Sequence, residues 1–186
     1  MAGRRSMLLR SPYFWAAIVA MVTLPLIRPL FRHIPDPPPV SGRLPTFALI
    51  DQRGRPFGLA DLEGRVQIVD FFSTTGALDP TRAMHTLQRR LKQHRLPIRL
   101  ISITVDPGDT PPLLARYARA HDADPHRWSF LTGPGLQLQR LAAVHRPGRF
   151  LIVDGDGGIR GQYHPDKMGL DEMFHRSQHV LRDQRR

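Results

Sequence analysis

The sequence predicts an α/β fold, and three kinds of pattern indicate it. Two uninterrupted apolar runs, VQIVDFF at 66–72 and IRLISITV at 98–105, are typical of strands buried on both faces of a sheet. Apolar residues at helical spacing lie between the two runs, which is the order of a βαβ unit with parallel strands. Short turns rich in Asp and Gly separate two further pairs of strands.

The composition fits one domain with an extension and excludes several kinds of chemistry. A chain of 186 residues with 41% hydrophobic content is long enough for one packed core. It contains no cysteine, so it has no disulfide, thiolate nucleophile, Cys-ligated zinc or iron–sulfur cluster. The net charge of +11 favours acidic surfaces such as anionic lipid headgroups. The arginines are scattered and accompany no nucleic-acid motif, so we expect no nucleic-acid partner.

Residues 11–31 predict a membrane anchor that follows a short basic N-terminus at 1–10. The run SPYFWAAIVAMVTLPLI at 11–27 is uncharged and mostly apolar. Its length reaches the lower limit of about 17 residues for a spanning helix, and the aromatic residues 13–15 suit the membrane interface. Arginines flank the run on both sides in similar number, so they do not fix its orientation.

Three alternatives to the anchor remain. A cleaved signal peptide lacks a convincing small-x-small site beyond the apolar run. A core helix is disfavoured by the basic ends and the terminal position, and an interfacial helix by the lack of a strong polar face. The Pro-rich residues 32–45 then predict a stiff, extended spacer, and the globular domain is predicted over 46–186.

The domain is predicted to begin with a hairpin and a βαβ unit. Residues 47–50 and 55–59 flank the turn DQRG and form the hairpin. Residues 66–72 form the first buried strand. A helix over 81–94 follows, with Met84, Leu87 and Leu91 at helical spacing, and leads to the second buried strand at 98–105.

The remaining pattern continues the alternation. Pro111 begins a helix to residue 121, because a proline in the first turn loses no hydrogen bond. The other predicted elements are a short helix at 136–143, a hairpin of 150–153 with 159–163 around DGDGG, and a closing helix at 168–181. This order is that of a thioredoxin-like fold, so we expect a three-layer sandwich with an N-terminal hairpin and an N-terminal transmembrane helix.

Four stretches carry a resemblance to a known family. They are LPTFALIDQRGRPFGLADLEGR at 44–65, ISITVDPGDTPPLLARYARAH at 101–121, WSFLTG at 128–133, and Val144-His145 followed by FLIVD at 150–154. In order and spacing they resemble the Sco/SenC family over residues 44 to 163. The resemblance implies a copper chaperone fold, held on the periplasmic side by an N-terminal anchor and a spacer.

Members of that family carry a Cys-x-x-x-Cys-Pro motif after the first buried strand. Its two thiolates and a distant His bind copper for delivery to cytochrome c oxidase, and the thiols can also reduce disulfides. The corresponding stretch here is FSTTGALDP at 72–80. Thr75 and Asp79 stand where the two cysteines would be, and His145 stands where the distant His would be.

The changed residues exclude the thiol chemistry of the family. Thiol–disulfide exchange and peroxidase activity require a thiolate, so we expect no such enzyme. Cu(I) prefers sulfur, whereas the Thr75 hydroxyl is neutral and hard. Asp79 and His145 could still hold Cu(II) or zinc, with Met84 or His85 as a further ligand if that helix face turns toward them. We therefore expect no certain cofactor, with copper as a possible ligand.

Most of these residues also have a purely structural interpretation. Asp79 precedes Pro80 and suits the N-cap of the following helix. Thr75 suits a turn in which its hydroxyl bonds to the loop backbone. A lone loop histidine such as His145 is commonly solvated or hydrogen-bonded.

Other clusters of polar residues are interpreted as structural. Asp106 ends a strand, and Asp109 or Thr110 caps the next helix. The DGDGG stretch at 154–158 forms a hairpin turn, because it lacks the later glutamate of a calcium loop. His175 and His179 share one helix face, which we expect to be solvated.

The leading functional hypothesis is a respiratory-assembly accessory without redox activity. It would be membrane-bound through its single N-terminal helix and would bind an oxidase subunit or an assembly factor. The alternative is a copper-binding chaperone that uses His145 with Asp79 and a nearby Met or His. A third hypothesis, less favoured, is an enzyme whose chemistry the sequence does not reveal.

Overall fold

The computed structural model describes residues 12–27, 37–76, 80–144 and 148–185, in two units, Met1–Asp36 and Pro37–Arg186. In the first unit, helix α2 (Pro12–Ile27) has 16 residues and no charged side chain. Across the described ranges, no helix combines the length and the apolar content needed to cross a bilayer. The predicted anchor at 11–31 extends beyond both ends of α2, outside the described residues, so the membrane span stays a prediction.

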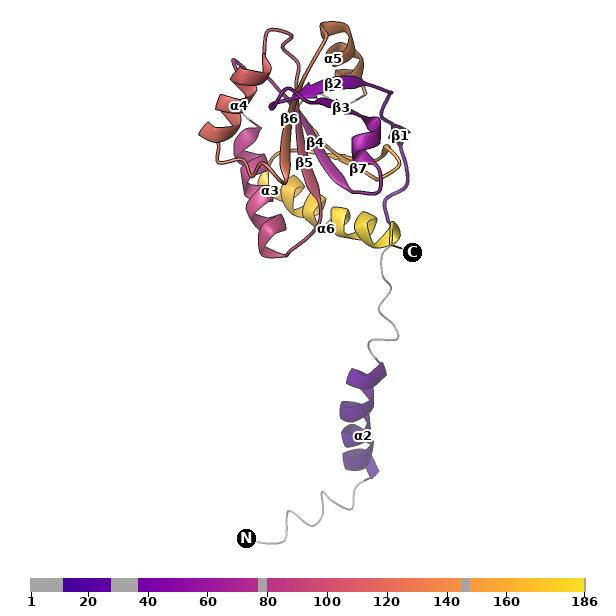
Figure 1. Ribbon diagram of the computed structural model, residues 1–186. Coiled ribbons are helices and arrows are strands. Elements are labelled where there is room, and N and C mark those ends of the chain that lie inside the picture. Colours follow the sequence, from indigo (N-terminus) through magenta and orange to yellow (C-terminus); the bar gives the residue numbers. More distant parts are fainter. Residues whose placement is uncertain (1–11, 28–36, 77–79, 145–147, 186) are drawn as a thin grey trace. The chain divides into compact units, whose positions relative to one another are not determined.

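The second unit is built on one eight-stranded sheet with the order β1-β8-β7-β4-β5-β6-β2-β3 (Figure 1). The central strands β4, β5 and β6 run parallel, and every other pair is antiparallel. The predicted βαβ unit is therefore confirmed. The strands are β1 (Gly42–Arg43), β2 (Ala48–Asp51), β3 (Pro56–Gly58), β4 (Gln67–Phe72), β5 (Arg99–Thr104), β6 (Trp128–Thr132), β7 (Phe150–Val153) and β8 (Gly158–Tyr163).

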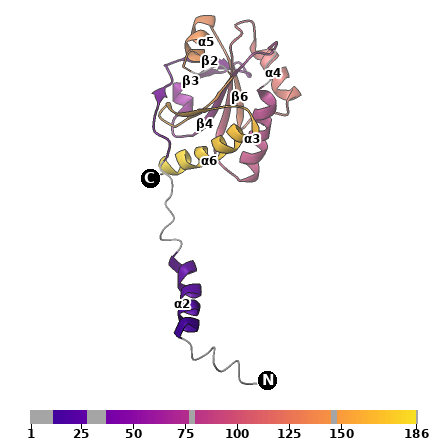
Figure 2. The same ribbon diagram turned by 180° about the vertical axis from the view of Figure 1, so that it is seen from behind.

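Helices cover both faces of this sheet, which gives the three layers expected (Figures 1 and 2). Successive strand residues point to opposite faces. Ile68 and Leu100 therefore pack with α3, α4 and α6, whereas Val69 and Ile101 pack with α5 and the 3-10 helix η2. The helices are η2 (Leu59–Leu62), α3 (Thr81–Gln93), α4 (Pro111–Ala120), α5 (Gly135–Ala142) and α6 (Lys167–Asp183).

The second half of the predicted spacer at 32–45 belongs to the domain. The Ser41 N–H donates to the Ile159 carbonyl at 2.8 Å, and β1 pairs with β8. Leu44 is buried, and the Arg160 guanidinium donates to the Pro38 carbonyl at 3.1 Å. The prolines keep this segment extended, which is also the conformation of an edge strand, so it pairs with the sheet instead of standing free.

Strand β6 is a second difference from the sequence-based expectation. Trp128 and Phe130 are fully buried, and the strand lies between β5 and β2. Its five residues follow a turn that is rich in polar groups, and their pattern is too short to separate from a loop. The strand completes the parallel set whose ends position the candidate site.

Candidate functional site

The loop after β4 contains the stretch that resembles the family's metal motif. It leaves the sheet at Phe72, and its described part ends at Gly76. Thr75 is exposed, and its hydroxyl lies 3.1 Å from the hydroxyl of Ser73. The Gly76 N–H donates to the Ser73 carbonyl at 3.2 Å. Thr75 therefore lies in a tight turn, where its hydroxyl meets another hydroxyl and not the loop backbone.

A buried carboxylate, that of Asp109, holds this loop to the sheet. The side chain of Asp109 accepts hydrogen bonds from the hydroxyls of Thr74 and Thr104, both at 2.5 Å, and from the Thr74 N–H at 3.3 Å. The Asp109 carbonyl accepts a further bond from the Thr132 hydroxyl at 2.6 Å. Thr104 and Thr132 are the last residues of β5 and β6. Asp109 thus joins the carboxyl ends of all three parallel strands.

This geometry corrects the expectation that Asp109 or Thr110 caps the following helix through its side chain. Thr110 is the N-cap residue of α4, but it makes no side-chain cap bond. Pro111 and Pro112 occupy the first positions of the helix and have no N–H to offer. The Asp109 carboxylate instead meets the threonine hydroxyls, which are donors from other strands.

Two of the three residues singled out for metal binding lie outside the described residues. These are Asp79 and His145, which fall in 77–79 and 145–147. The N-terminus of α3 is described from Pro80, whose carbonyl accepts the first helical hydrogen bond from the Met84 N–H at 3.0 Å. The capping role of Asp79 therefore stays a prediction.

The described residues do not by themselves form a copper site. Met84 is 0% exposed and belongs to the core beneath α3, so its thioether lies among apolar side chains. His85 is half-buried on the same helix. No group of three or more His, Asp or Glu side chains in the described part of the chain is arranged to hold a metal ion. The loop itself offers hydroxyl oxygens, which are poor ligands for Cu(I).

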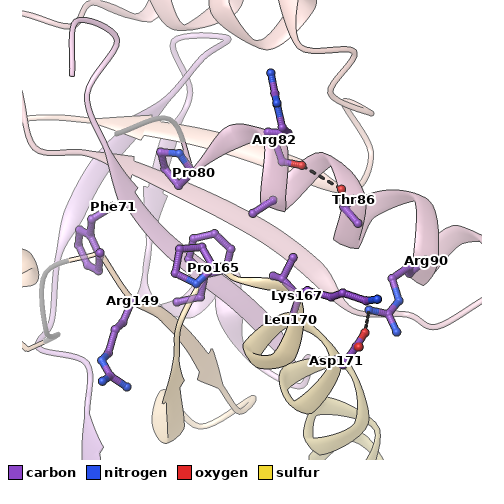
Figure 3. A pocket seen from close by; sticks show the side chains of 13 residues that line it. Phe71, Pro80, Arg82, Thr86, Arg90, Arg149, Pro165, Lys167, Leu170 and Asp171 are labelled. Carbon is purple, nitrogen blue, oxygen red and sulfur yellow. Dashed lines mark hydrogen bonds and ion pairs between the residues drawn. The ribbon is translucent and has the colours of Figure 1, made fainter. Parts of the chain in front are cut away.

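A cavity of about 630 Å³ opens beside the loop (Figure 3). Its wall is mostly apolar and includes Phe71, Phe150 and Leu170. Pro80 and Gly148 also line it, and each is a sequence neighbour of a segment that holds Asp79 or His145. Sequence analysis missed this cavity because its lining comes from separate segments of β4, α3, β7 and α6.

The rim of the cavity is basic. Arg82, Arg149 and Lys167 all line it, and Figure 3 shows the two guanidinium groups directed away from its centre. Arg90 pairs with Asp171 at 2.5 Å. An apolar wall inside a positive rim suits an apolar side chain carried on an acidic partner.

The remaining polar clusters have structural roles. The Asp154 carboxylate accepts hydrogen bonds from the Gly158 N–H at 2.7 Å and the Asp156 N–H at 3.1 Å. It also pairs with Arg160 at 2.6 Å. The predicted hairpin turn is therefore confirmed, and its carboxylate is occupied by protein donors instead of calcium.

Sequence comparison identifies relatives of this chain. The family described as SCO1/SenC matches residues 40–148. The SCO1 protein homolog of Bacillus subtilis (strain 168) is 32% identical over 99 residues, which are 51% of this chain and 51% of that protein. A Stutzerimonas stutzeri protein named for copper binding is 31% identical over 146 residues, 66% of this chain and 70% of that protein. The match thus spans only about half the length of the Bacillus relative.

Solved structures of the same family share the fold. BsSco, described as a member of the Sco family of cytochrome c oxidase assembly proteins, has a TM-score of 0.70 and 24% identity, covering 80% of this chain and 98% of BsSco. Yeast Sco1 with copper bound has a TM-score of 0.59 and 23% identity, covering 75% of this chain and 94% of Sco1. At these identities the likeness supports the fold alone, and the predicted thioredoxin-like α/β class is confirmed.

Proposed function

Because the chain belongs to the SCO1/SenC family, we propose that it acts in cytochrome c oxidase assembly as a membrane-anchored accessory that uses no thiol chemistry. The observation that carries this proposal is the absence of cysteine from all 186 residues. The family fold is kept, while Thr75 and Asp79 stand at the two motif positions. The role that remains is binding to an oxidase subunit or an assembly factor, with the domain on the periplasmic side.

The chemistry of the loop supports a binding role. A threonine hydroxyl keeps its proton near neutral pH, so Thr75 forms neither a thiolate–copper bond nor a mixed disulfide. The neighbouring Thr74 is already bonded to Asp109, which fixes the loop in place without a metal. The apolar cavity with its basic rim lies beside this loop and supplies a surface on which an acidic partner segment can dock.

The anchor is proposed from the apolar helix. Helix α2 carries no charged side chain over Pro12–Ile27, and further apolar residues, 7–9 and 29–31, lie beyond the flanking Arg10 and Arg28. Extraction of the full chain from membranes tests this point: detergent should release it, whereas carbonate and high salt should leave it in the pellet. Release by carbonate alone would contradict the anchor.

A copper-binding chaperone is the second candidate. It is favoured by the Stutzerimonas relative that is named for copper binding and by the copper-bound structure of yeast Sco1. Here the ligands would be His145 and Asp79. Two such ligands make a weak site, and Met84, which could have been a third, is buried in the core. For this reason we favour the accessory role.

Metal retention separates the two candidates. The full chain in detergent is loaded with Cu(I) or Cu(II), washed with a chelator and assayed for bound copper. The accessory role is expected to leave far less than one copper ion per chain, with no change in His145→Ala. The exposed His126 provides the matched control, His126→Ala. Near-stoichiometric copper that is lost in His145→Ala but kept in His126→Ala would establish the chaperone instead.

The biological role is tested by deleting the gene in the source organism. Cytochrome c oxidase activity should fall and should be restored by the wild-type chain. It should be restored equally by the double variant Asp79→Ala/His145→Ala, because the accessory role needs neither metal ligand. Unchanged oxidase activity in the deletion strain would overturn the assembly function.

Restoring the thiols tests whether the loop still has the geometry of the family. The double variant Thr75→Cys/Asp79→Cys is expected to bind roughly one Cu(I) per chain with His145, because thiolates are strong ligands for this ion. Its circular dichroism spectrum should match that of the wild type. A folded double variant that binds no copper would mean that the loop itself has diverged.

A further inference from the structure

We propose that an arginine-rich edge of the domain is a docking surface for anionic phospholipid headgroups. The surface lies where strands β4, β5 and β6 begin, opposite the end that carries the loop after β4. We call it the basic edge; it consists of Arg53, Arg55, Arg65, Arg99, Arg127 and Arg185. This inference rests on the proposed membrane location, although its test does not involve the anchor.

The strand pairing brings these arginines together. The Arg99 N–H donates to the Val66 carbonyl at 3.1 Å, and the Leu100 N–H donates to the Arg127 carbonyl at 2.8 Å. Arg65, Arg99 and Arg127 therefore stand at the starts of three adjacent parallel strands. They line two pockets of about 400 and 600 Å³, both of which include Arg99, His126 and Arg127.

The positive charge of the basic edge is only partly neutralised within the domain. Two aspartates lie among the arginines, and Asp51 is paired with Arg55 at 2.8 Å. The other, Asp61, accepts a hydrogen bond from the Gly58 N–H at 2.7 Å. Within the residues that the structure describes, Arg65 and Arg99 form no ion pair.

The closeness of Arg65 to Arg99 affects the pKa of Arg99. Burial lowers the pKa of Arg99 below its ordinary value, the nearby charge of Arg65 lowers it further, and Asp61 acts in the opposite direction. Arg99 stays charged at neutral pH, since an arginine loses its proton only in strong alkali. A phosphate placed between Arg65 and Arg99 would relieve their repulsion and accept hydrogen bonds from both guanidinium groups.

The path of the chain favours a lipid surface as the source of this phosphate. Arg160 bonds to the Pro38 carbonyl at 3.1 Å and contacts the Asp183 carboxylate at 3.3 Å. The next residues, Gln184 and Arg185, line the larger pocket. The N-terminal segment therefore enters the domain next to the basic edge. Residues 28–36, which precede it, reach about 30 Å at full extension, so a membrane holding the apolar segment lies within range.

Vesicle flotation tests the proposal on residues 37–186. Both hydrophobic cores lie within this range, so the piece contains everything that packs the domain. It is expected to float with phosphatidylcholine vesicles that contain phosphatidylglycerol, to ignore pure phosphatidylcholine, and to detach as salt is raised. The triple variant Arg65→Gln/Arg99→Gln/Arg127→Gln should partition on the order of a hundredfold more weakly, because each basic side chain contributes about fivefold.

A matched triple variant controls for net charge. Arg89, Arg116 and Arg140 are exposed and lie on α3, α4 and α5, away from the basic edge. Their replacement by Gln removes the same charge and should weaken binding only slightly. Equal loss in both triples, or no binding of the wild type to anionic vesicles, would overturn the proposal. So would tighter binding to a DNA oligonucleotide than to the vesicles at the same salt.

Two further variants separate binding from folding. Arg127 donates a hydrogen bond to the Leu96 carbonyl at 2.9 Å, so replacing it removes a contact within the fold as well as a surface charge. The lysine triple Arg65→Lys/Arg99→Lys/Arg127→Lys keeps the charge and should keep most of the vesicle binding. The pair Arg65→Gln/Arg185→Gln changes only exposed residues and should still lose binding at least tenfold. A pair that binds like the wild type would contradict the assignment of the surface.

Discussion

The two ends of strands β4, β5 and β6 differ in how far their polar groups are satisfied within the domain. At the carboxyl end, one carboxylate, that of Asp109, collects hydrogen bonds from Thr74 and Thr104. At the amino end, Arg65 and Arg99 lie close together, and neither forms an ion pair within the described residues. The polar groups of the carboxyl end are hydrogen-bonded to one another and hold the loop. The amino end instead keeps positive charge that can attract a partner. The amino end thus offers a second electrostatic surface, opposite the position of the family's metal motif.

The largest expected effect is at the carboxyl end. Asp109→Ala would remove the three hydrogen bonds to its carboxylate and leave the half-buried Thr74 hydroxyl without its acceptor. We expect the free energy of unfolding to fall by about 4 kcal/mol, measured by urea denaturation. Asp106→Ala is the control, because Asp106 is half-buried and accepts one bond, from the Gly108 N–H; about 1 kcal/mol is expected. Equal losses in the two variants would contradict the role given to Asp109.

The second largest loss of stability is expected at Arg160, which bonds the start of the domain to residues next to the basic edge. Its guanidinium is mostly buried and pairs with Asp154 at 2.6 Å. We expect Arg160→Ala to lower the free energy of unfolding by about 3 kcal/mol, since it leaves a buried carboxylate without its cation. Arg176 pairs with Glu172 at 3.7 Å on the surface and gives the control Arg176→Ala, with a loss below about 0.5 kcal/mol. If Arg160→Ala also lost less than about 0.5 kcal/mol, the start of the domain would be held by the pairing of β1 alone.

A smaller, pH-dependent effect is expected at Asp51, the paired acid of the basic edge. Burial acts to raise the pKa of the Asp51 carboxyl, but hydrogen bonds from the Arg55 backbone and side chain and from the Arg53 N–H outweigh it and hold the pKa below its ordinary value. A lowered pKa stabilises the fold above the unfolded value of about 3.9 and ceases to do so as the pH falls through the folded value.

Asp51→Asn should therefore lose about 1–2 kcal/mol of unfolding free energy at pH 7. The gap between variant and wild type should narrow as the pH is lowered below about 4. The exposed Arg55 side chain adds little through its charge, so raising the salt should change the gap only slightly. A gap that stays constant from pH 7 to pH 2 would show that the carboxylate charge is not what matters.

The smallest expected effect sharpens the comparison most directly. Arg65→Gln removes the positive charge next to Arg99, so the free energy of unfolding should rise by a few tenths of a kcal/mol in low salt. The same variant should bind anionic vesicles more weakly. Thermal unfolding at two salt concentrations measures the first change, and salt should abolish it. If Arg65→Gln lowered the free energy of unfolding, Arg65 and Arg99 would not repel each other in the folded domain.

The sequence predicted the elements whose pattern is local. The apolar runs at β4 and β5 and the helical spacing of α3 each lie within one short window, and the structure confirms them. What it missed depends on distant partners. Strand β1 has two residues and exists because β8 lies beside it, and β6 is a strand because β5 and β2 flank it.

The same distinction between local patterns and long-range contacts explains how much of the candidate site could be predicted. Resemblance located Thr75, Asp79 and His145 by their order in the chain, but it could not reveal what holds the loop. Asp109 was interpreted as a helix cap, which is a local role, whereas Thr74, one of its partners, lies 35 residues away. The basic edge was equally hidden, because the arginines are scattered in sequence and meet only when the strands align.

The shortness of β1 has a mechanical consequence. Gly42 and Arg43 pair with β8 at the margin of the sheet, and the chain that leads to the apolar helix continues directly from this strand. Tension on the segment that precedes the domain would load β1 first. This strand can separate from β8 while both hydrophobic cores stay packed. Freeing residues 37–43, which precede the buried Leu44, would lengthen the segment before the domain by about 23 Å. The β1 segment is thus a reserve of chain length that becomes available under tension.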